Sequence, residues 1–233
     1  MKLNLAIKKW KNLSLLLILI FVVGLAYTWI SNVNEPEIEK SEQPTEIEKS
    51  EQINVANEKY IEMSKGSDNA PVTFIEYASL TCPACAAFHN DVYPKLRKEY
   101  IETGKVKFIH REIYFDRAGL WAALTARCTD AVKRYFGMLD LLYSEQPIWS
   151  RSDNSDKIVE ALLKISAKSG IGKERAISCL ENQEKALDLV NQYKIYVNEN
   201  AIESTPTFVI NGEKYSNMSY EEIKEIIEKE LKN

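Results

Sequence analysis

The sequence predicts an α/β domain with a helical insertion, preceded by a membrane segment and a disordered linker. Three observations predict this class. Segments typical of β-strands lie toward both ends of residues 57–233, a helix-forming segment joins the first two, and a long stretch after the second has helical periodicity. A chain of 233 residues, 45% of them hydrophobic, is long enough to bury a sizeable core.

Residues 1–32 predict a signal sequence or membrane anchor. Four lysines precede an apolar run at 13–30, and no basic residue follows it before Lys40. This asymmetry predicts that the N-terminus stays inside and the rest is exported, and the run is long enough to span a bilayer. We favour a retained anchor, which places the protein at the periplasmic face of the inner membrane. The small-x-small sequence at 24–26 leaves a cleaved signal peptide and a soluble periplasmic product as the alternative.

Residues 33–56 predict a disordered acidic linker. They contain few large apolar side chains, and the heptapeptide Glu-Ile-Glu-Lys-Ser-Glu-Gln begins at both Glu37 and Glu46. A segment of this composition cannot bury enough surface to fold. We therefore expect a tether that holds one folded domain, residues 57–233, away from the membrane.

The strands of the domain are predicted from runs of β-branched and aromatic residues. Residues 72–77 and 106–114 have this composition. A third run, 207–210, is followed by the hairpin signal Asn211-Gly212 and by a return strand at 213–215. A helix between the first two strands predicts that they pair in parallel through a crossover connection.

The helices are predicted from capping residues and from apolar spacings of three and four. One helix should run from the cysteine pair described below to about Thr103, with a kink at Pro94. Residues from about 117 to about 200 are predicted to form the helical insertion. The last helix begins in a capping box of Ser219 and Glu222, and its apolar face should pack against the sheet.

The tetrapeptide Cys82-Pro83-Ala84-Cys85 carries the strongest chemical signal. It follows a predicted strand and opens a predicted helix, the setting in which two cysteines at this spacing act as a redox pair. Unpaired N–H groups and the helix dipole favour a thiolate at Cys82, so we predict that Cys82 is the nucleophile and has a lowered pKa. Pro83 suits the first helical turn, and Cys85 can resolve a mixed disulfide.

Other interpretations of the pair stay open at this point. Cys82 and Cys85 could form a structural disulfide, or bind zinc together with His89. The zinc site is short of ligands, because the one other histidine, His110, lies in a predicted strand. A copper chaperone that holds Cu(I) between the two thiolates is a non-enzymatic alternative, although the chain has only four methionines to enrich such a site. We predict no metal and no cofactor.

Three segments, 66–72, 76–85 and 204–208, resemble the DsbA-type family of exported thiol:disulfide oxidoreductases. The resemblance covers most of the predicted domain and implies a thioredoxin-like fold. It also implies that Thr205 and Pro206 form the family's cis-proline loop, with the proline against the cysteine pair and the Thr205 backbone open to an extended substrate. Spacing alone leaves an ordinary trans proline as the alternative.

Glu76 stands six residues before Cys82, where the family carries a buried acid beneath the active site. The resemblance implies that Glu76 relays a proton to and from Cys85, and burial would raise its pKa for that task. The alternative is a solvent-facing glutamate, because strand alternation places Ile75 and Tyr77 on the opposite face.

Two departures from the family leave the direction of electron flow open. Strongly oxidising members carry histidine where this chain has Ala84, and valine where it has Thr205. We expect an oxidase that donates its disulfide to cysteine-containing exported proteins and is reoxidised by a quinone-linked, DsbB-like membrane partner. A reductase or isomerase of the same fold is the alternative, and a catalytically inactive adhesion or scaffold domain is a third.

Cys128 and Cys179 lie in two predicted helices of the insertion. A bridge between them would close a loop of about 50 residues and stabilise the fold by on the order of 4 kcal/mol. We interpret them as a structural disulfide, similar to the second disulfide of some α-proteobacterial members of the family. Two free buried thiols are the alternative, because Cys128 falls on an apolar stripe.

Charge and composition argue against a nucleic-acid partner. The net charge is -4, and the basic residues are scattered or held at the N-terminus, so they form no basic stripe. The segment between the linker and the first strand is too short for a dimerisation domain, and we therefore predict a monomer.

Overall fold

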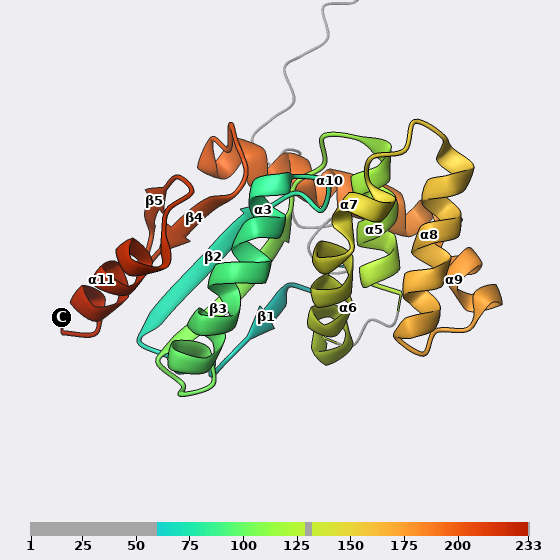
Figure 1. Ribbon diagram of the computed structural model, residues 1–233. Helices are drawn as coiled ribbons and strands as arrows, with labels where there is room; N and C mark the ends of the chain where they lie inside the picture. The colour runs from blue at the N-terminus through green and yellow to red at the C-terminus, as the bar shows by residue number, and fades with distance from the viewer. Residues whose placement is uncertain (1–59, 129–131, 233) are drawn as a thin grey trace, which may run out of the picture. The chain divides into compact units, whose positions relative to one another are not determined.

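The computed structural model describes residues 60–128 and 132–232, which contain a five-stranded mixed sheet. The strands run in the order β1-β3-β2-β4-β5, with β2 and β3 parallel and the other neighbouring pairs antiparallel (Figure 1). Their bounds are β1 Met63–Lys65, β2 Val72–Ala78, β3 Val106–Glu112, β4 Thr207–Ile210 and β5 Glu213–Tyr215. The predicted α/β class is therefore confirmed.

The predicted membrane segment at 1–32 and the predicted linker at 33–56 lie outside the described residues. Among the residues that are described, no helix has the length and apolar character needed to cross a membrane. Tyr60, the first of these residues, already packs against the hydrophobic core.

The centre of the sheet positions the site described below. Strand β2 lies between β3 and β4, and its Glu76 is in register with His110 on one side and Phe208 on the other. The turn from β4 to β5 contains Asn211 and Gly212, with φ of 46° and 89°. Asparagine and glycine tolerate this left-handed conformation best, which explains why the hairpin forms at this dipeptide.

Strand β1 has no counterpart among the predicted strands. Its three residues, Met63–Lys65, lack a β-branched or aromatic pattern, and the strand forms because it pairs antiparallel with β3, with Met63 opposite His110. Strand β3 also ends earlier than predicted, at Glu112, where its pairing with Ala78 of β2 ends. Both differences come from tertiary pairing, which local composition does not record.

The segment after the cysteine pair is helical but not uniformly α-helical. It consists of α3 Pro83–Ala87, the π-helical η1 Phe88–Val92, α4 Tyr93–Leu96 and the π-helical η2 Arg97–Ile101. Pro94 falls in the first turn of α4, directly after η1. Because proline lacks an N–H and its ring crowds the preceding turn, the wider π-helical turn accommodates it. The helix type therefore changes directly before Pro94, and the predicted kink stays a prediction.

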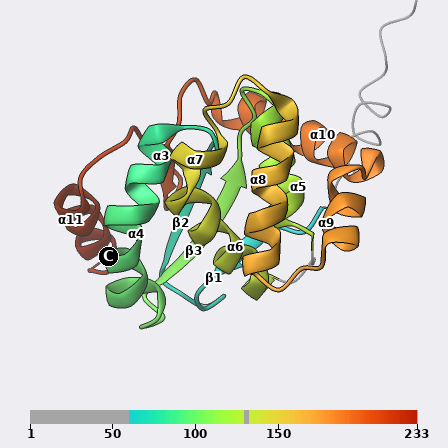
Figure 2. The same ribbon diagram turned by 45° about the vertical axis from the view of Figure 1, so that its right-hand side comes forward.

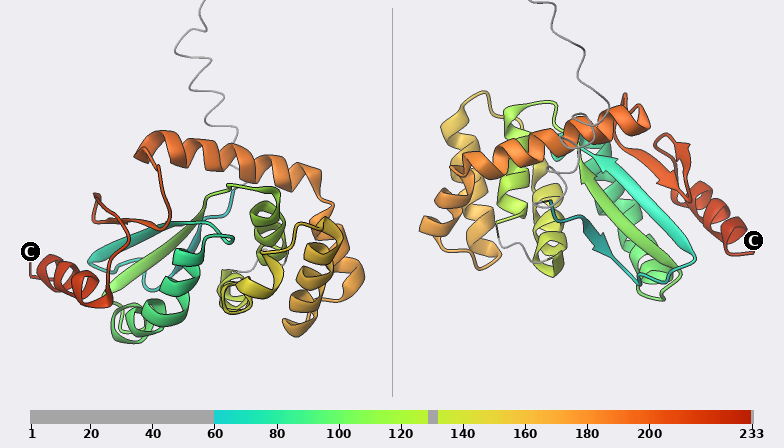
Figure 3. Two further views of the ribbon diagram at one scale, coloured as in Figure 1. Left: turned by 45° about the horizontal axis from the view of Figure 1, so that its top comes forward. Right: turned by 180° about the vertical axis from the view of Figure 1, so that it is seen from behind.

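The remaining helices lie mostly to one side of the sheet. They are α5 Arg117–Ala126, α6 Val132–Ser144, α7 Gln146–Trp149, α8 Ser155–Lys168, α9 Lys173–Leu180, α10 Gln183–Asn200 and α11 Tyr220–Glu230. Helices α5, α6, α8 and α9 gather on the side away from β4 and α11 (Figure 2), and α10 runs from this group back toward β4 (Figure 3). The capping box predicted for the last helix is confirmed, because Ser219 and Glu222 bond reciprocally at the start of α11.

Hydrophobic side chains cover both faces of the sheet. On one face the Phe88 ring of η1 packs 4.8 Å from Phe208 and 6.4 Å from Phe74, measured between ring centroids. On the other face a smaller cluster gathers around Tyr77 and Tyr196 of α10. A polar side chain at the centre of β2 is therefore cut off from solvent on either side.

Candidate active site

Two cysteines and a distant loop meet at the N-terminus of α3. Cys82 directly precedes the helix, and Pro83 is its first residue. Cys82 is half-buried, Cys85 is fully buried, and both thiols are free. The bond between Thr205 and Pro206 is cis, and Cys82 Sγ lies 3.3 Å from the Thr205 carbonyl oxygen. The structure therefore brings the cysteine pair and the predicted proline loop together.

The two thiols have opposite pKa shifts. A hydrogen bond from the Cys85 side chain, with further bonds from the backbone N–H groups of Cys85 and Ala84, lowers the pKa of Cys82 to about 5. Burial, the hydrogen bond to Cys82 and the charge of Glu76 raise the pKa of Cys85 far above its usual range. Near neutral pH, Cys82 is therefore a thiolate while Cys85 keeps its proton. The acidity of Cys82 does not require a histidine at position 84.

Two side chains of the inserted helices hold the active-site loop. Gln146 Nε2 donates to the carbonyl oxygens of Leu80 at 2.8 Å and Cys82 at 2.9 Å. Asp116, which caps α5, accepts a hydrogen bond from the Thr81 hydroxyl at 2.8 Å. The sequence did not reveal either residue, because both lie far from the cysteines in the chain and belong to no recognisable motif.

Glu76 is fully buried in β2. Its Oε2 lies 2.8 Å from His89 Nε2, and its Oε1 has no hydrogen-bond partner among the described residues. The alternative of a solvent-facing glutamate is wrong, because the sheet is covered on both faces and Ile75 and Tyr77 pack into the cluster on the opposite side. The role of Glu76 in proton transfer stays a prediction.

The sequence spacing presents His89 only as a third zinc ligand. In the structure, His89 is 4% exposed and its Nε2 bonds to Glu76. Its ring stacks on Tyr143 with 4.1 Å between ring centroids and 16° between planes. The signal that could have found this residue is its position four residues after Cys85, which places both side chains on the same side of a helix.

A second buried acid lies on the neighbouring strand. Glu112 accepts hydrogen bonds from Arg127 Nε at 2.6 Å, from Arg127 Nη2 at 2.7 Å and from the Tyr135 hydroxyl at 2.8 Å. Burial alone would raise the pKa of Glu112, but the charge and hydrogen bonds of Arg127 lower it to about 2. The Tyr135 oxygen also lies 2.6 Å from His110 Nδ1, so this cluster extends toward the groups beneath the cysteines.

Glu76, His89 and His110 place potential metal-ligand atoms within 4.8 Å of one another. Glu76 and His89 already bond to each other, and the two ring nitrogens of His110 face the hydroxyls of Tyr135 and Tyr143. A metal ion would have to displace all of these hydrogen bonds.

Cys128 and Cys179 form a disulfide with 5.5 Å between their Cα atoms. Cys128 follows α5, and Cys179 lies in α9. The bridge therefore connects two parts of the inserted helices, and the two residues are not the free thiols of the alternative interpretation.

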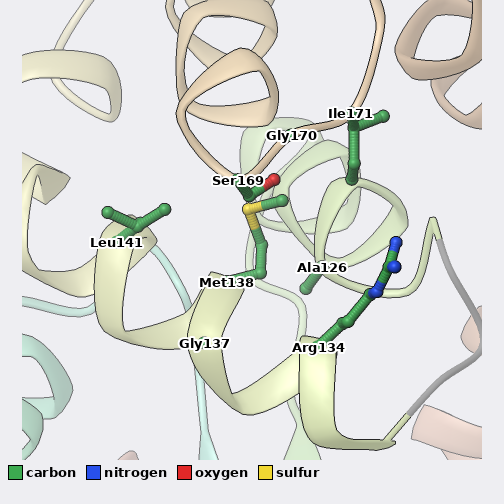
Figure 4. A pocket seen from close by; sticks show the side chains of 8 residues that line it. All are labelled: Ala126, Arg134, Gly137, Met138, Leu141, Ser169, Gly170 and Ile171. Carbon is green, nitrogen blue, oxygen red and sulfur yellow. The ribbon is translucent and has the colours of Figure 1, made fainter.

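A cavity of about 440 Å³ opens among α5, α6 and the loop between α8 and α9 (Figure 4). Its lining residues are Ala126, Arg134, Gly137, Met138, Leu141, Ser169, Gly170 and Ile171. None of the predicted site residues is among them, and the lining has no cysteine, histidine or carboxylate. We therefore assign the redox chemistry to the cysteine pair and not to this cavity.

Comparisons with known proteins agree with this assignment. A family model described as Thioredoxin matches residues 58–229. Disulfide bond formation protein D of Bacillus subtilis is 30% identical over 180 residues, which cover 72% of this chain and 76% of that protein. The crystal structure of alpha-DsbA1 from Wolbachia pipientis is similar with a TM-score of 0.68 and 27% identity, covering 73% of this chain and 91% of that one.

The match spans less than two thirds of the length of the curated Rickettsia relatives. A curated relative from Rickettsia prowazekii is 29% identical over 170 residues, which cover 73% of this chain but 61% of the relative.

Proposed function

This chain belongs to the thioredoxin family, and on that premise we propose that it is an exported, DsbA-like thiol:disulfide oxidoreductase that introduces disulfides into other exported proteins. The observation that carries the proposal is the asymmetry of the cysteine pair, in which an accessible, acidic Cys82 adjoins a buried Cys85 of very low acidity. Stabilising the Cys82 thiolate stabilises the reduced protein, and a protein with a stabilised reduced form is a stronger oxidant.

The reaction is a thiol–disulfide exchange in two steps. A substrate thiolate attacks Cys82 Sγ of the Cys82–Cys85 disulfide, the S–S bond breaks, and Cys85 leaves as a thiolate that takes up a proton. A second substrate thiolate then attacks the substrate sulfur of the mixed disulfide and expels Cys82 as a thiolate. The low pKa of Cys82 makes it a good leaving group in this step. Two electrons pass from the substrate thiols to the cysteine pair.

The surroundings of Cys82 suit an extended, partly apolar polypeptide. The Thr205 carbonyl lies beside the thiol, so a substrate strand that bonds to this backbone brings its own cysteine within reach. Phe115 and Ile148 are 59% and 74% exposed. Phe115 adjoins Asp116, which bonds to the active-site loop, and Ile148 shares α7 with Gln146. We therefore assign these two side chains to contacts with cysteine-containing substrate proteins.

Export and membrane attachment rest on the sequence of the first 56 residues. The lysines and the apolar run within 1–32 support a retained anchor at the periplasmic face of the inner membrane, and the acidic composition of 33–56 supports a tether. A monomeric domain, residues 57–233, then works close to the membrane. A quinone-linked, DsbB-like membrane partner reoxidises it after each turnover.

A reductase or isomerase of the same fold is the second candidate. It is favoured by Ala84 between the cysteines and by Thr205 before the cis-proline, since both positions differ from those of strongly oxidising members of the family. Its disulfide would be more stable than that of an oxidase, and a different membrane partner would keep it reduced.

The reduction potential of the Cys82–Cys85 pair separates the two candidates. The full-length protein is equilibrated with glutathione buffers, and the oxidised fraction is measured with the Cys128–Cys179 disulfide intact. A potential of about -120 mV supports the oxidase. A potential at or below about -230 mV overturns the oxidase assignment in favour of a reductase or isomerase.

Two control experiments address the non-enzymatic candidates. Cys82→Ser should abolish oxidation of a reduced dithiol peptide and Cys128→Ser should retain it, whereas equal activity in both variants would point to a scaffold domain. Stoichiometric copper on the freshly purified reduced protein would replace the oxidoreductase assignment with a copper chaperone.

A further inference from the structure

Two buried polar side chains share one hydrogen bond beneath the cysteine pair. Glu76 Oε2 and His89 Nε2 are 2.8 Å apart, and both side chains are almost completely shielded from solvent. Glu76 Oε1 and His89 Nδ1 have no hydrogen-bond partner within the described part of the chain. One proton can therefore sit on either member of the pair, giving a carboxylic acid beside a neutral imidazole or a carboxylate beside an imidazolium.

The backbone holds His89 in this position. His89 lies four residues after Cys85 and belongs to the π-helical η1, a type of turn that frequently occurs at functional sites. Its ring is stacked on Tyr143, which prevents it from swinging away from Glu76. The imidazole is thus fixed between the helix that carries Cys85 and the strand that carries Glu76.

His110 is the other histidine close to Glu76. It lies opposite Glu76 in the register of β2 and β3, and its ring centroid is 5.6 Å from that of His89. Burial lowers the pKa of His110 to about 4, so it is neutral at neutral pH.

Hydrogen bonds fix His110 in one neutral tautomer. Arg127 keeps Glu112 ionised, so the single hydroxyl hydrogen of Tyr135 points to Glu112. The Tyr135 oxygen must then accept from His110 Nδ1, and His110 Nε2 accepts the hydroxyl hydrogen of Tyr143. In this series of hydrogen bonds, from Tyr143 through His110 and Tyr135, each hydrogen points toward Glu112. His110 therefore has no hydrogen to give to Glu76.

We propose that His89 is a positioning residue for the proton transfer to and from Cys85 that the resemblance implies for Glu76, and that His89 shares the transferred proton with Glu76. The proposal rests on the proposed function and deepens it. When a substrate thiolate attacks Cys82, the Cys85 sulfur leaves with the electron pair of the broken S–S bond and takes the stored proton. The pair is left as a carboxylate beside a neutral imidazole. On reoxidation the Cys85 thiol returns this proton as its sulfur attacks the mixed disulfide on Cys82.

The surrounding titratable groups do not compete for the stored proton. Those coupled to the pair from the neighbouring elements are Cys82 and Cys85 at α3, Tyr93 in α4, His110 in β3 and Tyr143 in α6. Burial raises the pKa of both tyrosines, so they stay neutral. In the mixed disulfide Cys82 carries no charge, and Cys85 is then the one new anion next to the pair.

Nuclear magnetic resonance of the histidine rings tests the proposal directly. The chain contains two histidines, so full-length protein with ¹⁵N-labelled histidine gives two sets of ring signals. We expect the His89 nitrogen shifts to change between the oxidised and reduced states. If the stored proton is on Glu76, the neutral imidazole carries its hydrogen on Nδ1, and if it is on His89, both ring nitrogens carry one. After the proton has passed to Cys85, only Nε2 carries a hydrogen, which it donates to the Glu76 carboxylate. The His110 shifts should stay the same and act as the internal control. Identical His89 shifts in both states would overturn the proposal.

A substitution provides the kinetic test. His89→Gln keeps an amide that can bond to Glu76 but cannot carry the proton. The measured quantity is the rate at which Cys85 displaces glutathione from Cys82, from pH 4 to pH 9. We expect this rate to fall about tenfold at pH 7 and its pH profile to shift, with the alkylation rate of Cys82 unchanged. An unchanged rate and profile in the folded variant would refute the role of His89.

The proposed function is tested independently of the proton store. If the protein fails to oxidise a reduced dithiol peptide but shows the redox-dependent shifts of His89, the proposed role of His89 stands and the oxidase assignment is wrong. If the protein oxidises the peptide but its His89 shifts do not change, the oxidase assignment stands and the proposed role of His89 is wrong.

Discussion

The structure buries two glutamates on neighbouring strands, and they differ in their partners. Glu112 in β3 accepts hydrogen bonds from Arg127 and Tyr135, and its pKa is lowered to about 2. Glu76 in β2 has His89 as a partner for one oxygen and no partner for the other among the described residues. The first acid is held as an anion at neutral pH by its ion pair with Arg127, whereas the second has no cationic arginine or lysine bonded to it in the described part of the chain. Both acids are almost completely buried, so the difference between them lies in their partners and not in their exposure.

The largest effect in this comparison should come from Arg127→Met. The substitution leaves the Glu112 carboxylate buried without its cation, which costs about 3–5 kcal/mol of the free energy of unfolding. Urea unfolding at pH 7 measures it. The double variant Arg127→Met/Glu112→Gln removes both charges and should recover much of the loss. A loss below about 1 kcal/mol in the single variant would show that the ion pair does not hold the fold.

Acid should destabilise the wild-type protein through Glu112. Its folded-state pKa of about 2 lies below the ordinary value of 4.5, so the unfolded chain binds the proton first. The stabilisation is therefore complete above about pH 4.5 and is lost as the pH falls toward 2, by a total of about 3 kcal/mol. Unfolding measured across this range should show the loss in wild type, and the Glu112→Gln variant should lack this component. An equal acid dependence in both proteins would contradict the assignment.

Tyr135→Phe should have an intermediate effect, because this hydroxyl joins the two regions. Its removal takes one donor from Glu112 and the acceptor from His110 Nδ1, at a cost of about 1–3 kcal/mol. The ring ¹⁵N signals of His110 should show that its tautomer is no longer fixed. A His110 spectrum identical to that of wild type would mean that Tyr135 does not orient the chain of hydrogen bonds.

Glu76→Gln should change stability least. The amide can keep the hydrogen bond to His89, so we expect a change within about 1 kcal/mol. Glu112→Gln, by contrast, leaves Arg127 unpaired and should destabilise by several-fold more. Parallel urea unfolding of the two variants measures the contrast. Equal destabilisation would remove the distinction between the two acids.

The parts of the fold that local patterns encode were predictable from the sequence. Strand β2 follows from its β-branched and aromatic composition, and the β4–β5 hairpin follows from Asn211-Gly212. Cys82 and Cys85 stand out because their spacing and their place between a strand and a helix have a chemical meaning. These signals depend on a few adjacent residues.

The resemblance predicted the buried Glu76 and the cis-proline loop, but the hydrogen-bond partners of the site were not predictable, because they depend on register and on the inserted helices. Glu76 faces His110 because β2 and β3 pair in one register, and a slip of one residue would turn Glu76 to the other face. His89 meets Glu76 through the π-helical turn, which no short motif announces. Tyr143 and Gln146 come from α6 and α7, some sixty residues after the cysteines in the chain.

The hydrogen bonds from Gln146 to the backbone of Leu80 and Cys82 bear on how such proteins can be divided or recombined. Helices α5–α10 come from one continuous stretch of sequence, which suggests that this stretch could be deleted or exchanged as a unit. A minimal protein without them would keep both cysteines but lose the donor that holds the Cys82 carbonyl and the ring that covers His89. A redox centre transplanted to another scaffold must therefore include α6 and α7, and chimaeras that join the sheet of one relative to the helices of another should work best when position 146 keeps an amide.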